Sequence, residues 1–185
     1  MRNVGTAITS VGTVVLAVGG CEPEWPANDS GAARVEFTSH ACGSTSADSF
    51  SIPIGEEPTT NRTLGRRVST GEYDAEVACA VQQEGDGYWI SAVLRQPPYS
   101  FLVVGTVESR EDERYEGNAE VRLVTPGTGE LWSDEGACTL TVSEQQDVSR
   151  GRVWGSYRCL VYSPGGDADL SCAIEGDFVF EGCDI

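Results

Sequence analysis

The feature that most constrains the fold is a two-residue alternation of apolar and polar side chains that repeatedly places cysteines in the apolar phase. Residues 138–142 read Cys-Thr-Leu-Thr-Val, with the cysteine and the aliphatic residues in one phase and the threonines in the other. The same alternation runs through residues 73–81, 155–161 and 172–180. Successive side chains along a strand point to opposite faces. These segments therefore predict strands with cysteines on their buried faces, namely Cys79, Cys138, Cys159 and Cys172.

From residue 34 onward, turn-forming residues separate short β-branched and aromatic runs, and no window of a dozen residues shows a helical period. We therefore predict an all-β fold, an antiparallel sandwich or barrel-like domain of about nine short strands stabilised by disulfides. Gly85 and Gly87 supply the backbone freedom that tight hairpin turns require, so residues 73–95 predict a hairpin. The predicted strands cover residues 34–39, 48–54, 73–82, 88–95, 100–107, 118–125, 137–143, 152–162 and 171–180.

The N-terminal segment has a different character. Arg2 is followed by a run of apolar and small residues from position 4 to position 18, which is shorter than the roughly 20 residues of a transmembrane helix and fits the apolar region of a secretory signal peptide. Val18-Gly19-Gly20-Cys21 ends this run and resembles the lipobox of bacterial lipoproteins, with valine in place of the usual leucine. The resemblance implies diacylation of the Cys21 thiol, cleavage before Cys21 and acylation of the new amino group. An ordinary signal peptide and an uncleaved anchor are the alternatives.

This resemblance sets the predicted organisation: residues 1–20 are a signal peptide, residues 21–33 a lipid anchor and tether, and residues 34–185 a single all-β domain. The tether is polar and contains Pro23 and Pro26. Two or three acyl chains anchor a protein stably without a membrane span. In Gram-negative lipoproteins an Asp after the lipidated cysteine typically favours the inner membrane. Glu22 stands there instead, so we expect the outer membrane of the cell envelope.

The cysteine count agrees with this interpretation. Seven cysteines is an odd number, and lipid on Cys21 leaves an even set. Disulfides persist in the periplasm or on the cell surface and rarely in the cytosol. We expect three disulfides among Cys42, Cys79, Cys138, Cys159, Cys172 and Cys183. Fifteen pairings are possible, and the one we favour is Cys42–Cys79, Cys138–Cys183 and Cys159–Cys172.

The charge of the chain restricts its partners. It has 29 Asp and Glu residues against 12 Arg and no Lys, for a net charge of −17. Affinity for nucleic acid depends on basic groups that displace counterions from phosphates. We therefore expect no nucleic acid as a partner. The expected partners are the membrane, through the N-terminal lipid, and a protein, glycan or other envelope component that the sequence does not identify.

The sequence contains no recognisable catalytic or metal motif. His40 is the only histidine, and neither a G-x-S-x-G elbow nor the paired ligand spacing of a zinc site occurs. We therefore predict no catalytic residue, no metal site and no cofactor. Paired carboxylates can hydrolyse glycosides, and Glu175, Asp177 and Glu181 form an outward stripe. A solvated face that pairs with Arg158 or Arg152 across the sheet is the simpler explanation of these acids.

Four residues are candidates for ligand binding. Trp89 and Trp154 are out of phase with the inward apolar residues of their strands, so their indole rings are expected on an outer face. Asp167 and Asp169 follow a turn and carry the oxygen ligands that calcium prefers. We therefore predict a lipid-anchored envelope protein of non-catalytic, binding or structural type. A carboxylate-based glycoside hydrolase and a calcium-dependent adhesion module are the alternatives.

Overall fold

The computed structural model describes residues 29–38, 51–55, 67–109, 115–126, 128–143, 145–162 and 172–185. The strands are β1 (Ser30–Phe37), β2 (Ser51–Ile54), β3 (Val68–Ser69), β4 (Glu76–Glu84), β5 (Gly87–Gln96), β6 (Tyr99–Ser109), β7 (Tyr115–Thr125), β8 (Gly129–Trp132), β9 (Cys138–Val142), β10 (Asp147–Ser149), β11 (Arg152–Val161) and β12 (Cys172–Glu181). A short 3-10 turn, η1 (Glu72–Asp74), precedes β4. None of the helical structure in the described part of the chain is long and apolar enough to cross a bilayer.

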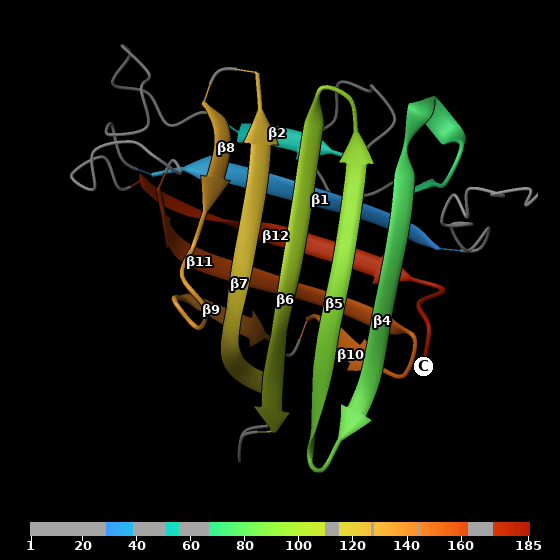
Figure 1. Cartoon of the computed structure of the whole chain (residues 1–185). Coiled ribbons are helices and arrows are strands. Elements are labelled where there is room, and N and C mark those ends of the chain that lie inside the picture. Colours follow the sequence, from blue (N-terminus) through green and yellow to red (C-terminus); the bar gives the residue numbers. More distant parts are fainter. Residues whose placement is uncertain are drawn as a thin grey trace, which may run out of the picture.

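Nine of these strands form an antiparallel, nearly closed barrel, which confirms the predicted fold class. Their order is β2-β1-β12-β11-β9-β7-β6-β5-β4, and β3, β8 and β10 pair with β1, β7 and β11. Figure 1 shows β4 to β7 in front, crossing the β1, β12 and β11 layer behind them at a steep angle. The nine predicted strands correspond to these nine, although β1 begins at Ser30 rather than at residue 34. Residues 30–33, predicted as tether, therefore belong to the barrel.

The predicted hairpin is formed by β4 and β5. Glu84 pairs with Gly87, and Gly85 at the first position of the two-residue turn has φ 58°. Asp86 at the second position has no positive φ, which is the pattern of a type II′ turn, and such turns match the twist of the flanking strands. The hairpin leaves β4 as the last strand of the sheet, and no other strand among the described residues pairs with its outer edge.

Side chains and the chain ends satisfy the hydrogen-bonding groups on this edge of β4. The Thr70 hydroxyl accepts from the Val77 N–H at 2.9 Å and donates to the Val77 carbonyl at 3.0 Å. The buried Asp29 carboxylate, just before β1, accepts from the Cys79 N–H at 2.9 Å. These bonds join the first part of the chain to the last strand of the sheet and so help to close the barrel.

The C-terminal tail completes the closure. After Gly182 the chain turns along β4, where the Asp184 N–H donates to the Cys79 carbonyl at 2.9 Å and the Asp184 carbonyl accepts from the Val81 N–H at 2.9 Å. A disulfide between Cys79 and Cys183 fixes the tail to the strand. Edge strands with free N–H and C=O groups invite pairing with other chains, and the tail occupies the Cys79 carbonyl and the Val81 N–H on this edge of β4.

The disulfides differ from the favoured pairing. The structure joins Cys79 to Cys183 and Cys138 to Cys159, so the predicted Cys42–Cys79, Cys138–Cys183 and Cys159–Cys172 bridges are wrong. The register explains the second disulfide, because β9 and β11 place Thr139 opposite Arg158 and therefore Cys138 opposite Cys159. On the other side of β11, Cys172 faces Val161 rather than Cys159. Cys172 is itself disulfide-bonded.

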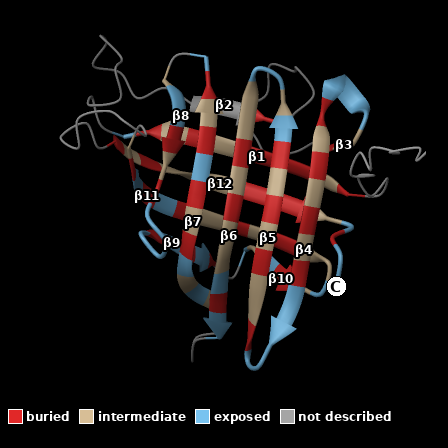
Figure 2. Cartoon of the chain, in the orientation of Figure 1, coloured by how far each residue is buried: buried red, intermediate tan, exposed pale blue. Residues whose placement is uncertain are grey.

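The core fills the space between the crossing layers, and Figure 2 shows the alternation of buried and more exposed residues along the strands. Phe101 packs against Tyr157 and Phe178 with ring centroids 5.3 and 6.2 Å apart. The Tyr157 hydroxyl donates to the Arg34 carbonyl at 3.1 Å. Burial raises the pKa of Tyr157 well above its usual value, and nearby Asp177 and Glu36 raise it further. Tyr157 is therefore a neutral core residue.

Candidate functional site

The candidate site is a groove on the outer face of the β1, β12 and β11 layer. Two adjoining hollows of about 480 and 540 Å³ share Ser156 and Asp177, and volumes in this range suit small-molecule ligands. The first hollow is also lined by Glu36, Thr139, Thr141, Tyr157, Arg158, Glu175 and Gly176. The second is also lined by Arg34, Ser143, Gln145, Gln146 and Trp154. We call the two hollows together the outer groove.

The strand register brings these side chains together from distant parts of the sequence. Ser156 of β11 lies opposite Asp177 of β12 and Thr141 of β9. Glu36 of β1 lies opposite Glu175, which in turn lies opposite Arg158. Side chains in such rows share one face of the sheet. The groove is therefore built on strands, with the β9–β10 connection adding Gln146 at its border.

A hydrogen-bond chain fixes the centre of the groove. The Gln146 side-chain amide donates to the Ser156 hydroxyl at 2.6 Å, and that hydroxyl donates to Oδ1 of Asp177 at 2.8 Å. The Gln146 side-chain carbonyl accepts from the Ser143 N–H at 2.9 Å, which holds the amide in place. Within the described residues the bonds to Asp177 reach only Oδ1. Oδ2 of Asp177 is thus an acceptor available to a ligand.

Trp154 forms the apolar part of the groove. It is half-buried between the buried residues Val153 and Gly155, which agrees with the phase expected from the sequence. Across the sheet it lies opposite Val179, an outward residue that is only 5% exposed. The indole ring therefore has a packed apolar base and still contributes to the lining of the second hollow.

The acids of the predicted outward stripe are largely paired. Arg158 lies 3.0 Å from Glu175, and Arg152 lies 3.0 Å from Glu181. This is the pairing expected for a solvated face. Glu36 of β1 is not part of this stripe, but it stands opposite Glu175 in the register and has no ion-pair or hydrogen-bond partner among the described residues. Like charges directly opposite each other weaken a sheet, so the groove carries some unfavourable charge.

Gly176 makes the floor of the groove possible. A Cβ at this position would overlap the Arg34 carbonyl oxygen and come within 3.0 Å of the Tyr157 hydroxyl oxygen. The glycine thus permits the close approach of β1 and β12 at which the Tyr157 hydroxyl reaches the Arg34 carbonyl. No sequence pattern identified this requirement.

The remaining predicted binding residues do not join this site. Trp89 lies on β5, on the outer face of the opposite layer, so the two tryptophans do not form a common platform. Asp167 and Asp169 lie outside the described residues, as do Cys21, Cys42 and His40. In the described part of the chain no three His, Cys, Asp or Glu side chains are arranged to hold a metal ion.

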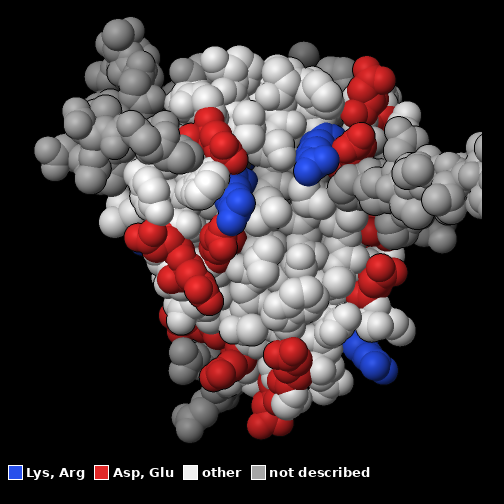
Figure 3. Space-filling model, viewed as in Figure 1, with Lys and Arg blue, Asp and Glu red and all other residues white. Residues whose placement is uncertain are grey.

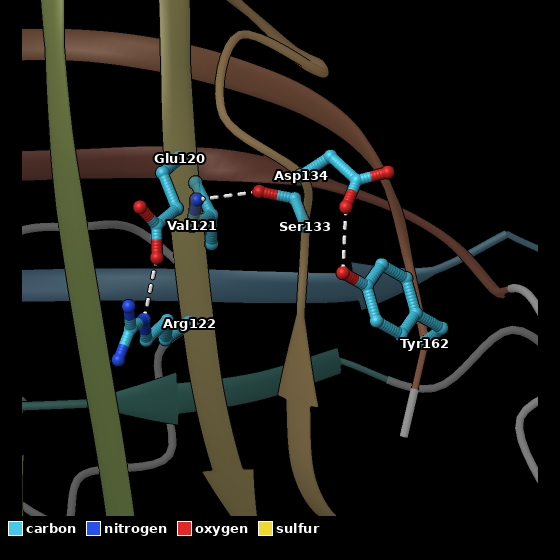
Figure 4. Close-up of polar contacts among 6 residues, drawn as sticks. All are labelled: Glu120, Val121, Arg122, Ser133, Asp134 and Tyr162. Atoms are coloured by element: carbon cyan, nitrogen blue, oxygen red, sulfur yellow. Dashed lines mark hydrogen bonds and ion pairs between the residues drawn. The ribbon is translucent and has the colours of Figure 1, made fainter. Parts of the chain in front are cut away.

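A second polar cluster, around β7 and β8, is structural (Figure 4). The Ser133 hydroxyl accepts from the Val121 N–H at 2.7 Å, and the Tyr162 hydroxyl lies 2.6 Å from the Asp134 carboxylate. The hydrogen bond to Asp134 raises the pKa of Tyr162. These contacts attach the segment after β8 to β7 and to the end of β11, and the cluster lines neither hollow of the outer groove.

Comparison with known proteins does not assign the chain to a family. No protein-family model matches it, no curated protein matches it, and no solved structure matches it. The functional proposal therefore depends on the chemistry of the sequence and of the outer groove.

Proposed function

We propose that the protein is a lipid-anchored, non-catalytic binding protein of a bacterial cell envelope, held to the membrane through Cys21 and binding a neutral saccharide in the outer groove. The observation that carries the anchor is the pattern of disulfides. It supports Cys21 as the one cysteine left over for lipid.

Chain geometry favours Cys42 as the partner of Cys172. The Thr38 N–H donates to the Ala173 carbonyl at 3.0 Å. Thr38 therefore lies beside the residue that follows Cys172, and Cys42 comes only four residues after Thr38 in the sequence. Cys21 precedes Asp29 at the opposite end of β1, where Ser30 pairs with Glu181. The length of β12 separates that end from Cys172, about 30 Å at the usual rise per residue.

Seven residues separate Cys21 from Asp29, so their Cα atoms are eight residue steps apart and at most about 26–29 Å from each other. Cys21 would therefore need a fully extended chain along the whole of β12 to reach Cys172, whereas Cys42 needs only a short connection. With Cys42 joined to Cys172, six cysteines form three disulfides and Cys21 keeps its thiol for acylation. This pairing replaces the Cys42–Cys79 pairing favoured from the sequence.

The outer groove supports a neutral saccharide as ligand. The ring of Trp154 offers a flat apolar surface to the C–H face of a sugar. Gln146, Ser156 and Asp177 offer donors and acceptors that are already fixed by hydrogen bonds. Of the described residues, three acids and two arginines line the two hollows, so an anionic ligand gains little there.

Hydrolysis has less support than binding. A carboxylate hydrolase needs one acid that keeps its proton near neutral pH. Glu175 has Arg158 as a partner, and Asp177 accepts a hydrogen bond from Ser156. Neither carboxyl group therefore stands alone in an apolar pocket, which is the environment that such an acid needs. The calcium alternative involves Asp167 and Asp169, which lie outside the described residues.

The anchor is tested by growth with a fatty-acid probe. The native chain is expected to take up the probe and to sediment with membranes, whereas Cys21→Ala takes up none. Equal labelling of the two chains contradicts the proposed anchor.

The binding site is tested by titration with cellotriose, maltotriose and chitotriose, with sialyllactose as the anionic comparison. Trp154→Ala is expected to weaken binding of the preferred neutral trisaccharide roughly tenfold, since an aromatic contact contributes about 1 kcal/mol or more. Trp89→Ala is the matched control on the opposite layer and should leave affinity unchanged. Affinity for sialyllactose alone, or no affinity for any neutral trisaccharide, contradicts the groove as a neutral saccharide site.

A further inference from the structure

The outer face of β4, β5 and β6 is apolar where an exposed sheet face is normally polar. In a barrel whose interior is filled by one set of alternating side chains, the other set faces water and is expected to be polar. The register instead places Ala78, Val93 and Leu102 in one row across the three strands. The next row contains Ala80, Ser91 and Val104. We call these two rows, with Trp89 beside them, the apolar face.

The apolar face is visible at the surface. Its residues are half-buried rather than buried, and Figure 2 shows half-buried positions, in tan, that alternate with buried ones along the front strands. Figure 3 shows an uncharged area over the same strands, with acidic residues around its border. Contiguous apolar surface with a polar border marks interaction sites in soluble proteins.

The described residues of the border carry a net negative charge. At the hairpin end, Glu84, Glu108 and Glu116 lie in one row, since Gly87 stands opposite both Glu84 and Glu108. Both described arginines of the border already have acidic partners nearby, because Arg95 pairs with Glu76 at 3.5 Å and Arg122 with Glu120 at 2.5 Å. The described residues of the border therefore include more acids than arginines.

A shallow hollow at one side gives the face a point of attachment. It has a volume of about 250 Å³ and is lined by Ala78, Ala80, Ser91 and Val93, with Asp184 of the C-terminal tail. An apolar side chain can fill the hollow while a neighbouring cation pairs with Asp184. Anchors of this kind, buried in a pocket and bordered by polar contacts, dominate the affinity of protein interfaces.

We propose that the apolar face binds a second, different protein, whose surface presents an apolar side chain surrounded by Lys and Arg. Charge complementarity selects this occupant: opposite charges around an apolar centre fix the orientation of a complex and exclude partners of like charge. A second copy of this chain would bring its own acidic border against the first. Anionic lipid head groups meet the same repulsion. This surface lies on the opposite layer from the outer groove, so it is independent of the saccharide proposal.

The test is photo-crosslinking of the full-length chain in the cells that produce it, with benzoylphenylalanine at position 93. The matched control places the crosslinker at position 160, since Leu160 is an exposed aliphatic residue on β11 of the opposite layer, 61% accessible. The expected result is one protein adduct from position 93 and none from position 160. Mass spectrometry of the adduct should place the crosslinked peptide beside Lys or Arg residues.

Two variants of the crosslinking chain complete the test. Leu102→Asp should reduce the adduct at least about tenfold, the loss expected of a central interface contact. Because this change can also affect folding, the exposed pair Glu84→Lys and Glu108→Lys at the hairpin end is measured in parallel and should reduce the adduct while the melting temperature stays unchanged. Four results would overturn the proposal. They are an adduct of two copies of this chain, an adduct with lipid alone, no adduct at all, and an adduct whose yield neither variant reduces.

Discussion

Removal of the Cys79–Cys183 disulfide is the perturbation that most directly tests how the barrel is closed. The two cysteines are 104 residues apart in sequence, and a loop of that length gives about 4.7 kcal/mol from chain entropy. The other disulfides shorten this loop and lower the figure by several tenths of a kcal/mol, because loop closure depends only on the logarithm of length. About 4 kcal/mol therefore remains.

The tail adds a second contribution. Without the disulfide, no covalent bond keeps the tail against β4, so the two hydrogen bonds between Asp184 and β4 are expected to be lost as well. Each of them contributes about 0.5–1.5 kcal/mol. The expected loss for Cys79→Ala with Cys183→Ala is thus about 5–7 kcal/mol. This is a large part of the stability of an ordinary domain, which is about 5–15 kcal/mol.

The matched control is Cys138→Ala with Cys159→Ala. These cysteines are also buried, but they are 21 residues apart, so the same relation gives about 3.4 kcal/mol. The free energy of unfolding is measured by urea titration under oxidising conditions. An equal or smaller loss for the Cys79–Cys183 pair than for the control would refute the idea that the tail closes the barrel along β4.

Two further predictions concern single residues. Burial raises the pKa of Asp29, nearby Asp184 raises it further, and the bond from the Cys79 N–H opposes this shift. The protonated carboxyl group therefore stabilises the fold at pH values below its unfolded pKa, and this stability is lost as the pH rises through the folded pKa. Asp29→Asn keeps an oxygen for the Cys79 N–H, so its melting temperature relative to the native chain should increase between pH 4 and pH 7, and a constant difference would contradict the assignment. Gly176→Ala should cost about 1–3 kcal/mol, because the added methyl overlaps the Arg34 carbonyl; urea titration measures this, and an unchanged midpoint would show that β1 and β12 have room to separate.

The alternation of side chains, with the turn residues between the runs, was sufficient to predict the nine strands of the barrel apart from the start of β1. Cys138, Leu140 and Val142 are buried while Thr139 and Thr141 are exposed, as the period requires. The short strands β3, β8 and β10 were not predicted because two to four residues are too few for a period to be recognised. The start of β1 was missed because small residues at positions 31–33 resemble a linker.

The disulfides and the sites depend on long-range geometry that a local pattern does not contain. Cys138 meets Cys159 only because β9 pairs with β11 in one register, and Cys183 meets Cys79 only because the tail turns back along β4. The phase of Trp154 indicated its outer position, whereas its neighbour Gln146 comes from the connection before β10 and had no signal. The apolar face was missed because the run in β6 is apolar in both phases.

Intact-mass spectrometry of the natively purified protein, with and without reduction, tests the central claim most directly. The account predicts a mature chain that begins at Cys21 and carries acyl groups, with a mass gain on reduction of two hydrogen atoms for each of three disulfides. A full-length chain without lipid and with seven free thiols would contradict it.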